Sequence, residues 1–129
     1  MFFKRTEGFR YKFEEPLQTT FTIVENGKAV EDEAAIGGIL DISPKGIKMF
    51  SSVDLSAGKM ICPQLEIRFI IDSLTIVAYG EVIWSRPYQK GRQYGIFFNN
   101  QQPLENLIVE ELKIRRKKEV IEEKKKINV

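Results

Sequence analysis

The segment QLEIRFIIDSLTIVAYGEVIWS, residues 64–85, decides the fold of this chain. Its first half alternates strictly, because Leu65, Ile67 and Phe69 are separated by charged residues. A period of two indicates a strand with one buried face, which is typical of antiparallel sheets. The polar turn at residues 71–74 interrupts the apolar pattern and predicts a tight hairpin.

The same alternation recurs on both sides of this hairpin. Phe21 and Ile23 alternate with threonines, and Tyr94, Ile96 and Phe98 are likewise spaced by two. Glycine and proline residues separate these short runs without any helical segment between them. We therefore predict six strands, at residues 17–25, 34–42, 46–52, 64–71, 74–85 and 92–99. A mainly β fold, a six-stranded antiparallel β-barrel, follows, because closing the sheet removes exposed edges.

The composition changes at Gln101, after which glycine is absent. Leu104, Leu107, Ile108 and Leu112 fall at helical spacing, which predicts a C-terminal α-helix packed on the barrel. Residues 113–126 carry eight positive and three negative charges and only a thin apolar seam. We expect this part to fray as a charged tail beyond the first three turns. Pairing with a partner helix, on another protein or in a homo-oligomer, is the alternative.

Three segments result: a basic N-terminal arm at residues 1–16, a barrel at 17–100, and a charged helix or tail at 101–129. Composition limits what they do. The formal net charge of +2 is too small for a protein held on DNA by charge alone. Without histidine, and with Cys62 as the single cysteine, the usual triads and metal sites are excluded. No apolar run is long enough to span a bilayer. These features predict a cytoplasmic binding domain without cofactor or metal, not an enzyme.

Two segments contain residue types that a core does not require. Residues 4–13 hold four cations and three aromatic side chains. Arginine forks bind phosphate oxygens in pairs and stack on flat rings, although a basic arm is commonly a solvated lead-in. Residues 40–47, LDISPKGI, join two predicted strands. Asp41 and Ser43 either cap the turn's own amides or face outward to a ligand, and both interpretations remain open.

Taken together, these segments resemble the PilZ family of small barrels that receive the bacterial second messenger cyclic di-GMP. The D-x-S-x-x-G element of that family matches Asp41, Ser43 and Gly46. The segments 80–84, GEVIW, and 91–98, GRQYGIFF, look like the fifth and last strands of the family. The C-terminal helix also fits, so the resemblance covers about residues 4–112.

The resemblance implies a cyclic di-GMP site without catalytic residues. Arg5 and Arg10 are expected to bind phosphate or guanine, with Lys4 as a further candidate. Asp41 would accept hydrogen bonds from a guanine edge, and Ser43 would add another. The remaining two candidates are Gly46, which would allow close approach of the ligand, and Trp84, which would neighbour a guanine.

The implied function is a receptor that changes conformation on nucleotide binding and regulates an unidentified protein partner in motility, adhesion or a related surface behaviour. The family's arginine element is R-x-x-x-R, whereas four residues separate Arg5 from Arg10. This departure supports an alternative, a PilZ-like domain that binds no nucleotide and acts as a protein-protein interaction module. A third interpretation, a barrel that stacks single-stranded nucleic acid on Phe9, Tyr11 and Phe13, is opposed by the nearly neutral charge.

Overall fold

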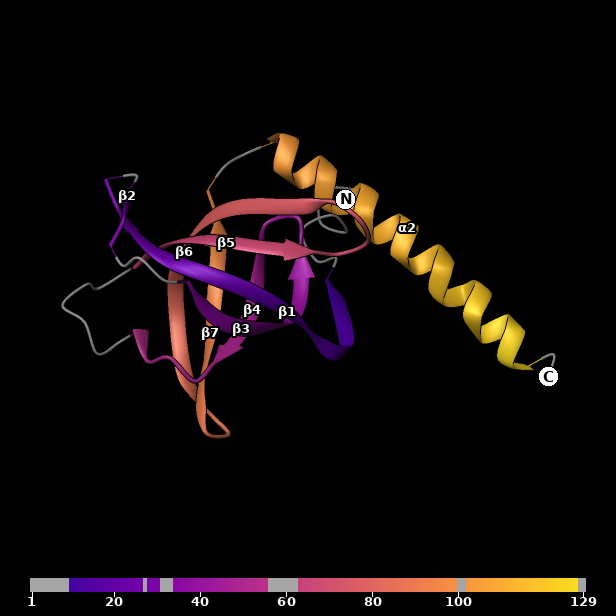
Figure 1. Ribbon diagram of the computed structural model, residues 1–129, viewed down its shortest axis with the longest axis horizontal. Helices are drawn as coiled ribbons and strands as arrows, with labels where there is room; N and C mark the ends of the chain where they lie inside the picture. The colour runs from indigo at the N-terminus through magenta and orange to yellow at the C-terminus, as the bar shows by residue number, and fades with distance from the viewer. Residues whose placement is uncertain (1–9, 27, 31–33, 56–62, 100–101, 128–129) are drawn as a thin grey trace, which may run out of the picture.

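The computed structural model describes residues 10–26, 28–30, 34–55, 63–99 and 102–127. Figure 1 shows strands curling into a barrel and one long helix that begins beside it and runs away from it. The elements are β1 (Tyr11–Glu25), β2 (Lys28–Ala29), β3 (Ala35–Ser43), β4 (Gly46–Ser51), β5 (Gln64–Ile70), β6 (Thr75–Tyr88), β7 (Gly91–Phe98) and α2 (Gln102–Ile127).

Six strands form the closed barrel, in the order β1-β3-β4-β7-β6-β5, and all neighbours are antiparallel. Closure occurs because β1 pairs with β3 on one edge and with β5 on the other. The predicted mainly β fold with six antiparallel strands is confirmed. The two-residue strand β2, which pairs antiparallel with the end of β1, was not predicted because both of its residues are exposed.

The first strand is longer than predicted, since β1 begins at Tyr11 and not at Leu17. Phe13 is buried in the core, so this part of the basic segment packs on the barrel. The pairing with β3 shifts register between Lys12 and Leu17, around Pro16, which has no N–H to donate. The arm predicted for residues 1–16 therefore ends in a strand. Residues 1–9 lie outside the described residues.

Helix α2 closes the core with three apolar residues at helical spacing. Leu104, Ile108 and Leu112 are buried, and Leu107 packs partly against the same core. The predicted contact of the first three turns is thereby confirmed. The predicted fraying after them is wrong, because the helix is continuous to Ile127.

Polar contacts extend the docking of α2 beyond its apolar face. The buried carboxylate of Glu111 accepts hydrogen bonds from the backbone N–H groups of Asp72, Ser73 and Leu74, at 3.3, 3.1 and 3.1 Å. The turn between β5 and β6 is held further by Arg115, which donates to the carbonyl of Ile71 at 2.8 Å, and by an ion pair of Lys118 with Asp72 at 2.8 Å. These contacts hold the helix past its third turn.

A tyrosine connects the start of β1 to the same helix. The hydroxyl of Tyr11 donates to the carboxylate of Glu119, and the Arg115 guanidinium lies 5.0 Å from the ring centroid of Phe13. Burial raises the pKa of Tyr11 above its ordinary value of 10.0, and the hydrogen bond to Glu119 raises that pKa further. The neutral phenol is therefore favoured in the folded protein.

This shift predicts how Tyr11→Phe changes stability with pH. The stabilisation from the Tyr11 hydroxyl is fully present below pH 10.0 and is lost as pH rises through the folded pKa. At pH 7 we expect the variant to lose about 1 kcal/mol in free energy of unfolding. Above pH 10.0 the gap between variant and wild type should narrow. Urea denaturation at pH 7 and above pH 10.0 measures the free energy of unfolding of both proteins. An equal difference between variant and wild type at the two pH values would contradict the prediction.

Candidate functional site

Arg10 and Asp41 meet beside the β3–β4 hairpin. The Arg10 guanidinium donates through Nε to Asp41 Oδ1 at 2.8 Å, and its Nη2 donates to the same oxygen. Lys48 Nζ lies 3.4 Å from the other carboxylate oxygen. Asp41 is nearly buried, whereas the Arg10 side chain is 44% exposed. The carboxylate thus orients two cations while the arginine keeps a face open to solvent.

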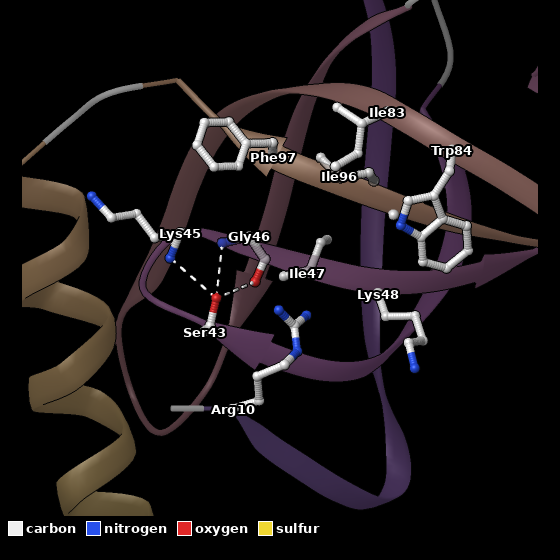
Figure 2. Close-up of a pocket in the computed structure, with 11 residues that line it drawn as sticks. Arg10, Ser43, Lys45, Gly46, Ile47, Lys48, Ile83, Trp84, Ile96 and Phe97 are labelled. Atoms are coloured by element: carbon white, nitrogen blue, oxygen red, sulfur yellow. Dashed lines mark hydrogen bonds between the residues drawn. The ribbon is translucent and has the colours of Figure 1, made fainter. Parts of the chain in front are cut away.

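Ser43, a predicted site residue, makes its hydrogen bonds within its own turn. Ser43 Oγ accepts from the backbone N–H groups of Lys45 and Gly46, each at 3.2 Å, and donates to the carbonyl of Gly46 at 3.4 Å (Figure 2). Of the two interpretations open for Ser43, the structure shows the inward one. The turn it closes presents the Lys45 side chain, whose Nζ is 3.0 Å from Glu105 at the start of α2.

Gly46 brings two strands together. A Cβ atom at this position would lie 2.2 Å from the carbonyl oxygen of Ile96 on β7. Real contacts of that kind are excluded by van der Waals repulsion, so only glycine fits where β4 meets β7. The close contact found at Gly46 is with neighbouring backbone, and the predicted approach of a ligand there stays a prediction.

Trp84 lies flat on Gly95. A Cβ at Gly95 would come within 2.1 Å of the indole, and the Arg86 guanidinium lies 5.0 Å from the ring centroid. The pairing of β6 with β7 shifts register between Val82 and Trp84. Such a bulge turns two successive side chains to the same side of the sheet, and Ile83 and Trp84 are both exposed. The indole thus offers an aromatic surface at the outside of the barrel.

These groups surround one cavity of about 460 Å³ on the outside of the barrel (Figure 2). Three cations and five large apolar side chains contribute, and none of the lining residues is acidic. The lining residues are Arg10, Ser43, Lys45, Gly46, Ile47, Lys48, Ile83, Trp84, Gly95, Ile96 and Phe97. Cations beside an exposed indole are suited to a ligand that combines negative charge with a flat ring.

The structure brings most of the predicted site together. Arg10, Ser43, Gly46 and Trp84 line the cavity, and Asp41 lies behind Arg10. Arg5 and Lys4 lie outside the described residues. Sequence reasoning did not assign the other seven lining residues, which are Lys45, Ile47, Lys48, Ile83, Gly95, Ile96 and Phe97.

Two of these omissions had a signal in the sequence. Lys48 follows Gly46 by two residues, so on a strand it faces the same side. Phe97 occupies an outward position between two buried residues, where a large apolar side chain is unexpected. Ile83 had no such signal, because its outward position depends on the bulge.

Neither a metal site nor a membrane-spanning helix is found in the described part of the chain. Within it, no three His, Cys, Asp or Glu residues are placed to hold a metal ion. No described helix combines the length and the apolar character needed to cross a bilayer.

The fold and the site thus combine a closed β-barrel with one outer cavity that is lined by three cations and an exposed indole. The family model of the PilZ domain matches residues 4–113, and the chain therefore belongs to the PilZ family. PilZ domains are binding and effector domains and not catalytic ones. A search among curated proteins finds no match to this chain.

Proposed function

We propose that this protein is a receptor for cyclic di-GMP. The observation that carries the proposal is the position of the D-x-S-x-x-G element. Its hairpin, which includes Lys48, forms one wall of the cavity, and the rest of the lining supplies Arg10 and the Trp84 indole. Cyclic di-GMP carries two phosphates and two guanines, so it presents both the charge and the flat rings that this lining suits.

Each lining group has a task in this proposal. Arg10 offers the exposed part of its guanidinium to a phosphate or a guanine, while Asp41 holds its Nε and Nη2. Lys45 and Lys48 also line the cavity and add positive charge to it. The Trp84 indole provides a stacking surface once Arg86 moves from the ring or shares it with a base. Arg5 and Lys4, which precede Arg10 in the chain, would complete the phosphate contacts.

No bond to the ligand is made or broken in this mechanism, so the output is conformational. Arg10 immediately precedes Tyr11, which is hydrogen bonded to Glu119 of α2. A ligand that repositions Arg10 would therefore act on the start of β1 and on the helix docked against it. Binding shifts this equilibrium only as far as its affinity differs between the two states. The proposed recipient of the change is a protein partner that controls motility, adhesion or a related surface behaviour.

One observation favours a second candidate function, a PilZ domain that binds proteins and not the nucleotide. The Ser43 hydroxyl is engaged within its own turn, and both Asp41 oxygens already face cations. A ligand must displace or share these contacts. A titration of the protein with cyclic di-GMP separates the two candidate functions.

Isothermal titration calorimetry with cyclic di-GMP tests the proposal, with GTP as the competing nucleotide. We expect saturable binding at micromolar or lower concentration, and the fitted stoichiometry distinguishes one nucleotide from a stacked pair. Arg10→Ala should weaken binding by about 30-fold or more, which corresponds to about 2 kcal/mol for a charge-assisted contact. The single tryptophan, Trp84, gives an independent fluorescence readout of the same site.

Arg68→Ala is the matched control. Arg68 is also an ion-paired arginine on the barrel surface, but its partner is Glu66 and it does not line the cavity. This variant should bind like the wild type. The receptor proposal fails if folded wild-type protein gives no binding heat or fluorescence change at about 100 µM nucleotide. It also fails if Arg10→Ala and Arg68→Ala bind equally well.

A further inference from the structure

The second half of α2 extends past the barrel. The helix spans 26 residues, which corresponds to about 39 Å. Among the described residues, Glu119 is the last that makes a hydrogen bond or ion pair with the barrel. Figure 1 shows the remaining turns, in yellow, continuing away from the strands. The turns beyond Glu119 gain no stability from packing on the barrel. Their helical structure and their exposed side chains therefore need another physical explanation.

Two isoleucines form an exposed apolar stripe on this helix. Ile114 and Ile121 are 40% and 52% exposed. They are seven residues apart, so they lie within about 20° of each other around the helix. The residues that face the core, such as Ile108, lie about a third of a turn away. The stripe is therefore separate from the barrel contact.

The charges along this stripe differ between its two ends. Glu110 lies one turn before Ile114, and Lys125 lies one turn after Ile121. Lys113 and Glu122 flank the isoleucines on opposite sides of the stripe and have the opposite order of sign. All four charged side chains are exposed, and within the described residues none has an ion-pair partner. Within the stripe itself, the acidic Glu110 at the start and the basic Lys125 at the end are complementary between two helices only when those helices run in opposite directions.

We propose that this stripe of α2 pairs with the same stripe of a second copy of the chain, antiparallel about a twofold axis between Lys117 and Lys118. This arrangement places Ile114 of each copy on Ile121 of the other. It also places Glu110 opposite Lys125. Such an isologous contact closes on itself and limits the assembly to a dimer.

The charges of the stripe oppose a parallel arrangement of the two helices. A parallel pair in register would place Glu110 on Glu110 and Lys125 on Lys125, and like charges at helix contacts are destabilising. Near the proposed axis, the Lys118 side chain is already drawn toward the barrel by Asp72 at 2.8 Å. Lys117 is the other lysine beside the axis; it is exposed, and its long side chain can extend to solvent. Because two isoleucine pairs bury little surface, the dimer should be reversible and dependent on concentration.

Sedimentation velocity of the full chain tests the pairing. The mass should rise from 14.9 kDa toward twice that value as concentration increases from about 5 to about 500 µM. Ile121→Glu should abolish the rise without unfolding the protein, since Ile121 is exposed. Glu110→Lys and Lys125→Glu should each weaken association about tenfold. The double variant E110K/K125E restores it, because both pairs are then reversed together.

Disulfide trapping on a Cys62→Ser background tests the direction. A mixture of the Ile114→Cys and Ile121→Cys variants should form a covalent dimer on oxidation, and neither variant alone should do so. A covalent dimer from Ile114→Cys alone would show a parallel pair and overturn the proposal. A mass of 14.9 kDa at every concentration, or a double charge reversal that restores nothing, would overturn it as well.

Discussion

Gly46→Ala should destabilise the barrel by about 3 kcal/mol or more in free energy of unfolding. The added methyl would lie 2.2 Å from the carbonyl oxygen of Ile96, and that oxygen belongs to the backbone of the neighbouring strand. The barrel is closed, so β4 cannot move outward without breaking its pairing with β3 or with β7. Thermal unfolding followed by circular dichroism should show the melting temperature reduced by roughly 10 °C or more.

Gly95→Ala provides a comparison in which the collision is with a side chain. A methyl there would meet the Trp84 indole, which is 38% exposed and can rotate toward solvent. We expect a smaller loss of stability and a clear change in tryptophan fluorescence. If Gly46→Ala were as stable as wild type, or less damaging than Gly95→Ala, the strand contact at Gly46 would not have the role assigned to it.

Glu111→Ala should cost about 2–4 kcal/mol, because it leaves three backbone N–H groups of the β5–β6 turn without their acceptor. It also removes a buried side chain from the contact between α2 and the barrel. Glu111→Gln retains one carbonyl oxygen and should lose less. Urea denaturation at low protein concentration measures both effects.

The neighbouring Glu110→Ala is the matched control. It removes the same chemical group one residue earlier on the helix, where the side chain is exposed. We expect a change within about 0.5 kcal/mol. Equal destabilisation by the two alanine variants would mean that helix propensity, and not the buried carboxylate, sets the stability of this region.

Much of this fold is predictable because the barrel has one buried face. The alternation of Leu65, Ile67 and Phe69 reports that face directly, and all three are buried as the pattern requires. Strand ends are also marked by glycine and polar turns. The start of β1 was misplaced because charged residues surround Tyr11 and Phe13, although the two aromatic rings stand at alternate positions and pack edge to face.

The candidate site is less predictable than the fold, for two physical reasons. The first is that bulges change which side chains face outward, and the shift beside Trp84 places Ile83 in the lining. The second is that one residue can serve the turn and the cavity together. Ser43 and Gly46 match the family element, yet the contacts they make are with the protein itself. A motif in the sequence does not distinguish these roles.

Lys45 belongs to the cavity and to the start of α2 at the same time, through its ion pair with Glu105 at 3.0 Å. An anion bound in the cavity, as proposed, would compete with Glu105 for this one ammonium group. Linkage is reciprocal, so whatever repositions the start of the helix alters anion affinity by the same factor. A pair this exposed is worth at most about 1 kcal/mol, which limits the factor to about fivefold. Lys45 can therefore adjust anion affinity modestly when the start of the helix moves. By itself this ion pair is too weak to switch binding on or off.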